Sequence, residues 1–369
     1  MTAEPAGADV PDEAAEPARP AGTGRDGTGL ASLLRGSPEP LSQRYDVALL
    51  DLDGVVYVGP AAVPGAPEAL AKAAGTGMRL AFVTNNASRT PAAIAAQLAG
   101  FRVPAAAADI ITSAQAAATL LAGRLAPGSA VLVIGSTALR MAVRERGLRP
   151  VSTALDRPAA VVQGYAPGVG YSQLLEGGLA VRAGAWFVAS NAVATLPTSR
   201  GIQPGNGALS QVIAYATGQQ PVVAGKPQPP LHAEAVARTG AQRPLVVGDR
   251  LDTDIEGAVR AGAPSLLVLT GISRPADAVL APAHQRPSYL AADLAGLLEP
   301  HPAVTSQAGA FCCGGWRAHG GHRGTELSLD GAGDPVDGLR ALCAAAWSLD
   351  AVSAAAIGPA LAALGPLAH

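Results

Sequence analysis

Short apolar runs alternate with Ala- and Leu-rich stretches of helical length from Tyr45 onward. This alternation predicts a parallel β-sheet joined by crossover helices, and near-continuous apolar strands indicate cover on both faces. The predicted strands span residues 46–52, 79–84, 130–134, 159–163, 186–189, 222–224, 244–247 and 265–269. The predicted helices span residues 91–99, 113–123, 138–146, 172–182, 208–217, 230–238 and 254–261. The pattern therefore predicts an α/β fold.

Four of the predicted strands end in polar residues instead of simple turn residues. The segments are Asp51-Leu52-Asp53-Gly54, Thr84-Asn85-Asn86, Gly225-Lys226-Pro227 and Gly248-Asp249. Because sites in open parallel sheets form at the carboxyl ends of the strands, we expect all four ends to converge on one crevice.

The stretch between Thr84 and Lys226 is far longer than one crossover unit, which needs only about 30 residues. It contains enough predicted elements for an inserted α/β cap domain. We predict a disordered tail over 1–44, a core over 45–115 and 221–298, a cap over 116–220, and an appendage of unknown role over 299–369. The appendage is expected to hold a hairpin and one helix near 339–349.

Charge and composition narrow the possible partners. The net charge of −2 provides no basic surface for nucleic acid or anionic membranes. Residues 351–369 carry no Asp, Glu, Lys or Arg, yet their Ala, Gly and Pro content favours a packed helix with a frayed end over a membrane span. Three cysteines and an N-terminus without a signal-peptide pattern predict a cytoplasmic protein with reduced thiols.

Two residue types are scarce enough to attract notice. The chain has only two lysines, Lys72 and Lys226, and only four asparagines. The asparagines are Asn85, Asn86, Asn191 and Asn206. A sequence biased in this way can retain such residues where Arg, Asp or Ser cannot replace them, or by chance at tolerant positions.

The pair Asp51 and Asp53 suggests acid–base and nucleophilic chemistry. An ordinary aspartate has a pKa near about 3.9, so Asp51 would be ionised and able to form a covalent acyl-phosphate. Asp53 would protonate the leaving oxygen and then activate water. An Asp-x-Asp-Gly segment can also be a simple turn, but here apolar residues flank both carboxylates, whose charge a metal ion would offset.

A magnesium site follows from the remaining acids. Asp51, the backbone carbonyl of Asp53 and Asp249 offer the oxygen ligands that Mg²⁺ prefers. We expect Asp254 to support these ligands without binding the metal itself. Thr253 is expected to cap the next helix, and a role at the start of that helix is also the plainer interpretation of Asp252.

Phosphate binding is expected from a second group of polar residues. Hydroxyl, amide and ammonium groups would hold the transferring phosphoryl group. The residues are Thr84, Asn85, Asn86 and Lys226.

The order of these segments resembles the haloacid dehalogenase superfamily: Asp-x-Asp-Gly, then a Thr strand, a Lys, and Gly-Asp-x4-Asp. The second acid, Asp53, is typical of its phosphatases. The long insertion, with Gly205-Asn206-Gly207 and Gly225-Lys226-Pro227, resembles the type IIA subfamily, which includes p-nitrophenyl, phosphoglycolate, pyridoxal phosphate and nucleotide phosphatases. The resemblance covers residues 45–298 and implies a Rossmann-like core, a C2-type cap, Mg²⁺, an aspartyl-phosphate intermediate, a small phosphorylated metabolite as substrate and a possible homodimer through the cap.

The cap departs from the family pattern at two positions. Near Asn191, Val193 replaces a usual acid, and Leu196 stands where pyridoxal phosphatases have a substrate-contacting His. These changes make the predicted specificity region less polar and argue against a pyridoxal phosphate specialist.

Other functions stay open from the sequence. A phosphotransferase with a non-water acceptor and a catalytically silent binding or regulatory protein would both retain this pattern. A zinc site is a further alternative for the appendage, although adjacent cysteines suit tetrahedral zinc poorly. Its ligands would be Cys312, Cys313, His319 and His322.

Overall fold

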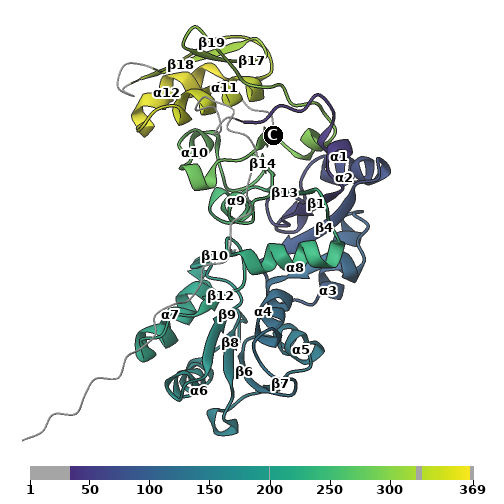
Figure 1. Ribbon diagram of the computed structural model, residues 1–369, viewed down its shortest axis with the longest axis vertical. Helices are drawn as coiled ribbons and strands as arrows, with labels where there is room; N and C mark the ends of the chain where they lie inside the picture. The colour runs from purple at the N-terminus through teal and green to yellow at the C-terminus, as the bar shows by residue number, and fades with distance from the viewer. Residues whose placement is uncertain (1–33, 199, 321–325, 366–369) are drawn as a thin grey trace, which may run out of the picture. The chain divides into compact units, whose positions relative to one another are not determined.

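The computed structural model describes residues 34–198, 200–320 and 326–365, and these form three sheet-based regions (Figure 1). The predicted tail lies mostly outside this range. Residues 34–44 are described, and they include helix α1 (Leu41–Arg44) with Leu41 fully buried. The folded part of the chain therefore starts before Tyr45.

The core is a six-stranded, all-parallel sheet. Its strands in spatial order are β15 (Tyr289–Ala291), β14 (Ser265–Val268), β13 (Pro244–Gly248), β1 (Val47–Leu50), β4 (Arg79–Thr84) and β5 (Ile110–Thr112). Alternate residues of each strand enter different hydrophobic clusters, as strand geometry requires. Helices α2 (Ala66–Gly75) and α3 (Pro91–Gly100) contribute to one cluster, and α4 (Ser113–Ala122), α8 (Pro229–Thr239) and α9 (Glu256–Arg260) to the other. A small hairpin, β2 (Tyr57–Val58) and β3 (Ala61–Ala62), follows β1.

The inserted cap has its own five-stranded parallel sheet. Its strands in order are β12 (Val222–Val223), β9 (Trp186–Ala189), β8 (Ala160–Gln163), β6 (Ala130–Ile134) and β7 (Arg149–Val151). Helices α6 (Tyr171–Arg182) and α7 (Asn206–Thr217) cover one face, whereas α4 and α5 (Thr137–Glu145) pack on the other (Figure 1). The hairpin of β10 (Thr195–Thr198) and β11 (Gly201–Pro204) precedes α7. These findings confirm the predicted α/β class with a parallel-sheet core and an inserted cap.

One strand lies in a different sheet from the one we predicted. Residues 222–224 were expected to join the core sheet, but β12 pairs with β9 at an edge of the cap sheet. Two residues of strand carry no sequence signal that distinguishes one parallel sheet from another. Lys226 therefore enters the site from a strand of the cap.

The C-terminal region is larger than the predicted hairpin and helix. It is a four-stranded antiparallel sheet with two helices. Its elements are β16 (Thr305–Gln307), β17 (Ala310–Cys313), β18 (Trp316–Gly320), β19 (Leu327–Gly331), α11 (Pro335–Trp347) and α12 (Ala354–Ala363). The outer strands were missed because β16 is exposed throughout and β19 buries only two side chains, Leu327 and Leu329.

The C-terminal sheet shares a hydrophobic cluster with the core. Leu267 and Leu290, from β14 and β15, pack with Leu339, Leu342 and other side chains of α11. Short helix α10 (Pro275–Val279) contacts both α11 and α12. The appendage is thus packed on the strands that carry part of the site. Among the described residues, no helix is long and apolar enough to cross a membrane.

Candidate active site

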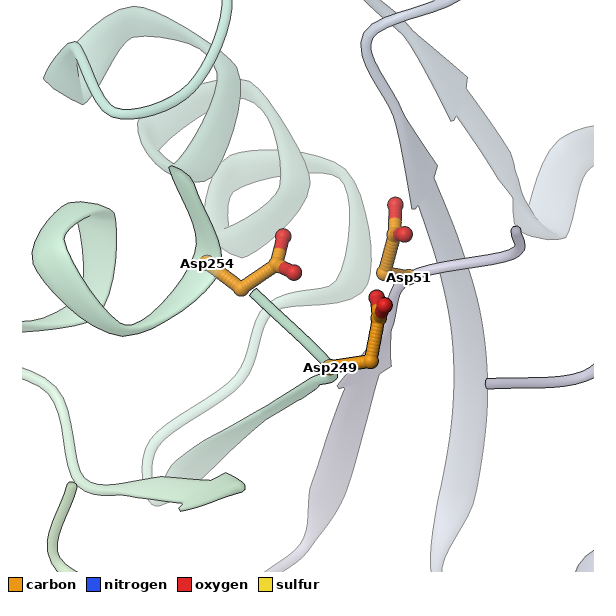
Figure 2. A group of neighbouring side chains, drawn as sticks. All are labelled: Asp51, Asp249 and Asp254. Carbon is orange, nitrogen blue, oxygen red and sulfur yellow. The ribbon is translucent and has the colours of Figure 1, made fainter. Parts of the chain in front are cut away.

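Three carboxylates meet at the carboxyl edge of the core sheet. Asp51 follows β1, Asp249 follows β13, and Asp254 lies in the π-helix Leu251–Ile255 that comes next. Figure 2 shows their carboxyl groups directed into one space. One oxygen from each lies within 4.8 Å of the others, and in the part of the chain that the structure describes this is the group of acids able to hold a metal. The expected convergence at this edge is therefore present.

Asp249 is held rigidly from several directions. The backbone N–H of Ile272 donates to its Oδ2 at 2.7 Å, and the N–H of Ser273 donates to its backbone carbonyl at 3.0 Å. A Cβ atom on Gly54 would lie 2.5 Å from Asp249 Oδ2, and one on Gly271 would lie 2.0 Å from it. Only glycine fits at either position, so the carboxylate is enclosed between two stretches of backbone.

The electrostatics of this group call for a cation. Asp249 Oδ1 is buried and has no hydrogen-bond partner. Without a metal, burial and then the charge of Asp254 raise the pKa of Asp249 to about 7. Burial raises the pKa of Asp51 to about 8, helped by Asp254 and Asp249 and opposed by Lys226. Without a metal, burial thus makes the carboxyl group of Asp51 harder to ionise than an exposed aspartate, and its ionisation in the metal-bound site stays a prediction.

The donor set fits magnesium. The site offers carboxylate oxygens from three acids, and hard cations prefer such ligands. One of these oxygens, Asp249 Oδ1, has no hydrogen-bond partner. A divalent cation there would satisfy Asp249 Oδ1 and favour the ionised forms of Asp51 and Asp249. Asp254 lies close to the other two acids, and its Oδ1 is 2.7 Å from Lys226 Nζ, so its expected place behind the metal ligands stays a prediction.

Lys226 provides the compensating charge from the protein. Its Nζ lies 2.6 Å from Asp51 Oδ1 and 2.7 Å from Asp254 Oδ1, and it donates to the backbone carbonyl of Val83 at 2.9 Å. Burial alone would lower the pKa of Lys226, but Asp254 and Asp51 outweigh this effect and raise it. The lysine is therefore a fixed ammonium ion beside the predicted nucleophile.

The predicted phosphate-binding segment after β4 is ordered by its own hydrogen bonds. The backbone N–H of Asn86 donates to Thr84 Oγ1 at 3.1 Å, and Asn86 Oδ1 accepts from both the N–H and the hydroxyl of Ser88 at 2.8 Å. Asn85 turns its side chain toward the backbone of Lys226. Thr84 and Asn86 thus lie on one ordered segment, which the Asn85 amide joins to the backbone of Lys226.

Asp53, two residues after Asp51, is exposed to solvent. Burial of its surroundings nevertheless raises the pKa of its carboxyl group, and the positive charges of Lys226 and Arg89 oppose this shift. Arg89 had no motif to mark it. An exposed carboxyl group with a raised pKa is suited to give and take a proton.

A cleft of about 360 Å³ lies between the cap and the core site. The cleft is lined by Ala192, Val193, Ala194, Thr195, Lys226, Pro227, Arg250, Asp252 and Thr253. Val193 therefore lies where the predicted specificity region should be. Asn191 is only 5% exposed, and Leu196 lies in β10 opposite Gln203, outside this lining.

The residues after Asp249 behave differently from simple helix caps. Thr253 was expected to cap the next helix, but it lies within the π-helix and faces the cleft. Arg250, which sequence reasoning passed over, donates to both oxygens of the exposed Asp252 at 2.9 and 2.7 Å. The Ile272 N–H was also missed, because a backbone donor has no side-chain signature.

The alternative zinc ligands do not gather in this way. Cys312 and Cys313 are consecutive residues of β17, so their side chains leave opposite faces of the strand. Cys313 is buried, and its thiol lies 3.6 Å from Asp337 Oδ1. His319 lies in β18 opposite Ala310, and His322 falls outside the described residues.

Family models match three segments of the chain. The haloacid dehalogenase-like hydrolase model covers residues 48–149, and a second model of HAD-hydrolase-like proteins covers residues 223–297. A GCN5-related N-acetyltransferase-like domain model matches residues 313–365, within the C-terminal sheet and its helices.

Similar proteins are phosphatases. D-glycerol 3-phosphate phosphatase of Mycobacterium tuberculosis is 46% identical over 316 residues, which cover 83% of this chain and 87% of that protein. A 5'-nucleotidase of Bacillus subtilis is 38% identical over 62% of this chain and 89% of its own length. The crystal structure of glycerol phosphate phosphatase from M. tuberculosis in complex with magnesium has a TM-score of 0.79 and 45% identity, covering 85% of this chain and 93% of that chain.

Proposed function

This chain belongs to the haloacid dehalogenase-like hydrolases of type IIA and is a Mg²⁺-dependent phosphatase of small phosphomonoesters, and from this premise we propose that it hydrolyses glycerol 3-phosphate or a similarly small polyol phosphate. The observation that carries the proposal is the meeting of Asp51, Asp249, Asp254 and Lys226 at one edge of the core sheet. The high similarity to a glycerol phosphate phosphatase over most of both chains supports the choice of substrate.

We assign the metal to the carboxylates of Asp51 and Asp249 and the backbone carbonyl of Asp53, with Asp254 beside them. When bound, Mg²⁺ supplies positive charge that stabilises the negative charge developing on the phosphoryl oxygens. Lys226 adds a fixed positive charge beside Asp51. Since Asp254 is also buried here, the ammonium group offsets part of its charge as well.

The first chemical step is assigned to Asp51. Its carboxylate oxygen attacks phosphorus, the bond from phosphorus to the ester oxygen breaks, and Asp53 gives its proton to the departing alcohol. Asp51 then carries the phosphoryl group as an acyl-phosphate. Hydroxyl and amide groups of Thr84 and Asn86, together with Lys226, would bind the phosphoryl oxygens in this step.

The second step returns both acids to their starting state. The Asp53 carboxylate takes a proton from water, the water oxygen bonds to phosphorus, and the bond between phosphorus and Asp51 breaks to release inorganic phosphate. Burial raises the pKa of Asp53, which favours its role as the group that gives a proton to the departing alcohol and takes one from water.

The cleft supports a small leaving group. Its volume of about 360 Å³ includes the space next to Lys226, and Val193 makes the cap side apolar. Next to Val193 the cap also presents Thr195, and the core side presents the Arg250–Asp252 pair and Thr253; these polar groups can hydrogen-bond a polyol.

The test compares the wild type with Asp51→Asn on glycerol 3-phosphate, a nucleoside 5'-monophosphate, phosphoglycolate, pyridoxal phosphate and p-nitrophenyl phosphate with Mg²⁺. We expect the highest kcat/KM of the wild type on glycerol 3-phosphate, and a loss of at least about a thousandfold in kcat for Asp51→Asn. Asp330→Asn, an exposed site on β19, is the matched control. Full activity of Asp51→Asn would refute the mechanism, and a clear preference for another ester would refute the substrate.

A homodimer through the cap is a further part of the proposal. Tyr171, Leu175 and Leu179 form an exposed apolar stripe at helical spacing on α6, and Val212 and Tyr215 extend it on the neighbouring α7. Contiguous apolar surface of this kind favours association. We expect Tyr215→Asp to shift the mass measured by light scattering from dimer to monomer, whereas Val259→Glu on α9 should leave it unchanged. A wild-type monomer would rule the dimer out.

The division into a tail, a two-part core, a cap and an appendage is retained as part of this proposal, with the core starting before Tyr45 and the cap extending through β12, and so is a cytoplasmic location. The described cysteines, Cys312, Cys313 and Cys343, are all free thiols, which supports a reducing environment.

A further inference from the structure

Three of the four asparagines form one hydrogen-bonded chain that runs from the cap to Lys226. Asn206 and Asn191 belong to the cap, and Asn85 belongs to the core. We refer to these three residues as the asparagine chain. Each amide has both a donor and an acceptor, so it can pass a fixed geometry from one segment to the next.

The link nearest the chemistry joins Asn85 to the backbone of Lys226. Asn85 Nδ2 donates to the Lys226 carbonyl at 3.0 Å, and Asn85 Oδ1 accepts from the Lys226 N–H at 2.8 Å. The amide thus binds both backbone polar groups of one residue. Because the same residue places its Nζ 2.6 Å from Asp51 Oδ1, a shift of this backbone would move the ammonium group.

The second link crosses from the cap to the core. Asn191 follows β9 of the cap, and its Nδ2 donates to the backbone carbonyl of Asn85 at 2.8 Å. Its Oδ1 accepts from the N–H of Val193 at 3.1 Å, and the residue is only 5% exposed. Both polar atoms of Asn191 are therefore occupied by backbone, which is unlike a side chain that contacts substrate.

The third link fixes Asn191 within the cap. Asn206, the first residue of α7, is 1% exposed and donates through Nδ2 to the Asn191 carbonyl at 2.7 Å. The same nitrogen lies 3.3 Å from the carbonyl of Gln163 at the end of β8. These two hydrogen bonds fix the positions of the cap sheet, α7 and Asn191 relative to one another.

The segments that contain Asn85, Asn191 and Gly225 are closely packed where they meet. A Cβ atom on Gly225 would lie 2.4 Å from Asn85 Oδ1, 2.6 Å from the Ser190 carbonyl and 3.0 Å from Asn191 Cβ. The cap segment 190–191, the core residue Asn85 and the backbone before Lys226 therefore touch at a single point. Displacement of any one of them must be felt by the other two.

We propose that Asn191 is a positioning residue, through which the cap seated on the core holds Lys226 in its place beside Asp51. This inference rests on the proposed function, because it concerns the same phosphatase site. Asn191, a cap residue, would thus affect the rate of the reaction without contacting the substrate. Three of the scarce asparagines would then share a common purpose.

The experiment uses Asn191→Asp in the full chain. The substitution keeps the shape of the side chain but replaces the Nδ2 donor with an oxygen that faces the Asn85 carbonyl. We expect kcat for p-nitrophenyl phosphate to fall about 10- to 100-fold, as small misplacements of a reacting group do, with KM changing less than about threefold. The Mg²⁺ concentration for half-maximal rate should stay the same.

Ser136→Ala is the matched control, because it also removes one hydrogen bond from the cap to the core. The Ser136 hydroxyl donates to the Ala87 carbonyl at 2.8 Å, outside the asparagine chain. We expect this variant to keep kcat within about twofold of the wild type. An equal loss in Ser136→Ala would mean that any loosening of the cap slows the enzyme, and it would overturn the inference.

A double-mutant cycle separates positioning from a merely structural effect. If Asn85→Asp and Asn191→Asp both act by displacing Lys226, the double variant should lose much less than the product of the two single losses. Independent, multiplicative losses would contradict the proposal, as would an unchanged kcat in a folded Asn191→Asp protein.

A second variant covers the case in which Asn191→Asp does not fold. Asn206→Asp acts on the asparagine chain one link further away and should also lower kcat. An unchanged kcat in this variant would overturn the inference.

The proposed function and this inference fail in different ways. A wild-type protein without Mg²⁺-dependent hydrolysis would reject the phosphatase assignment. An active wild type with a fully active Asn191→Asp variant would reject only the role of the asparagine chain.

Discussion

The cap and the C-terminal sheet are both additions to the same core, but they reach opposite halves of the site. The cap donates hydrogen bonds from Asn191 and Ser136 to the backbone of Asn85 and Ala87, next to Lys226. Helices α11 and α12 of the C-terminal region pack against α10, which follows the loop whose Ile272 and Ser273 N–H groups bind Asp249.

The contacts differ at the site itself. Both additions share a hydrophobic cluster with the core strands, but the cap also donates single hydrogen bonds to the backbone of Asn85 and Ala87. Trp347 also donates to the Ala278 carbonyl at 3.2 Å, and Arg340 donates to the Leu290 carbonyl at 2.6 Å. Loss of the cap hydrogen bonds beside Lys226 should therefore alter the rate, whereas changes in the C-terminal sheet and its helices should alter stability.

The largest effect is expected on the metal side. Asp249→Asn should lower kcat by at least about a thousandfold, because it removes a charge from a ligand that supports several kcal/mol of transition-state stabilisation. The rise in thermal midpoint that Mg²⁺ produces in the wild type should also vanish. Asp350→Asn, an exposed acid after α11, is the control. A persistent Mg²⁺-induced rise in Asp249→Asn would show that the cation binds elsewhere.

The next effect is a pH dependence of the metal-free protein. Burial raises the pKa of Asp249 to about 7 and of Asp51 to about 8, whereas both would titrate near about 3.9 in the unfolded chain. Between these values the folded state binds more protons than the unfolded state, so the free energy of unfolding should fall as pH rises from about 4 to about 8.

Magnesium should reverse that loss, and more strongly at high pH, because protons compete with it for the same carboxylates. We expect the Mg²⁺-induced gain in unfolding free energy to be larger at pH 8 than at pH 5 by more than about 1 kcal/mol, measured by urea denaturation with and without EDTA. Equal gains at the two pH values would contradict the assignment of these acids to the metal.

The smallest effect concerns the C-terminal sheet. Trp347→Phe keeps an aromatic ring in the buried position but leaves the Ala278 carbonyl without its donor, so the unfolding free energy should fall by at least about 1–2 kcal/mol. We expect kcat to stay within about twofold of the wild type. A fall in kcat as large as that of Asn191→Asp would erase the contrast between the two additions.

The sequence predicted the parts of the site that rest on side-chain type and chain order. Asp51, Lys226 and Asp249 were identified because charged residues follow apolar strands, and the structure brings them together. The carboxyl ends of neighbouring parallel strands must share an edge, so no tertiary knowledge was needed for Asp51 and Asp249.

Other features depend on contacts that no local pattern records. The Ile272 N–H that binds Asp249 is a backbone group, and Asn191 looks the same in sequence whether it faces substrate or a carbonyl. Strands β5, β7 and β15 have three residues each, which is too short for a periodic signal. Helix α2 was not among the predicted helices although it is ten residues long.

The enclosure of Asp249 between Gly54 and Gly271 also sets the mutational tolerance of the site. Neither glycine has a functional group, yet any side chain at these positions would collide with the carboxylate. In a scan of all single substitutions scored by phosphatase activity, both should tolerate replacement as poorly as the acids themselves. The set of positions that cannot change is thus wider than the set of residues that take part in the reaction. It includes Gly54 and Gly271, which have no reactive side chain.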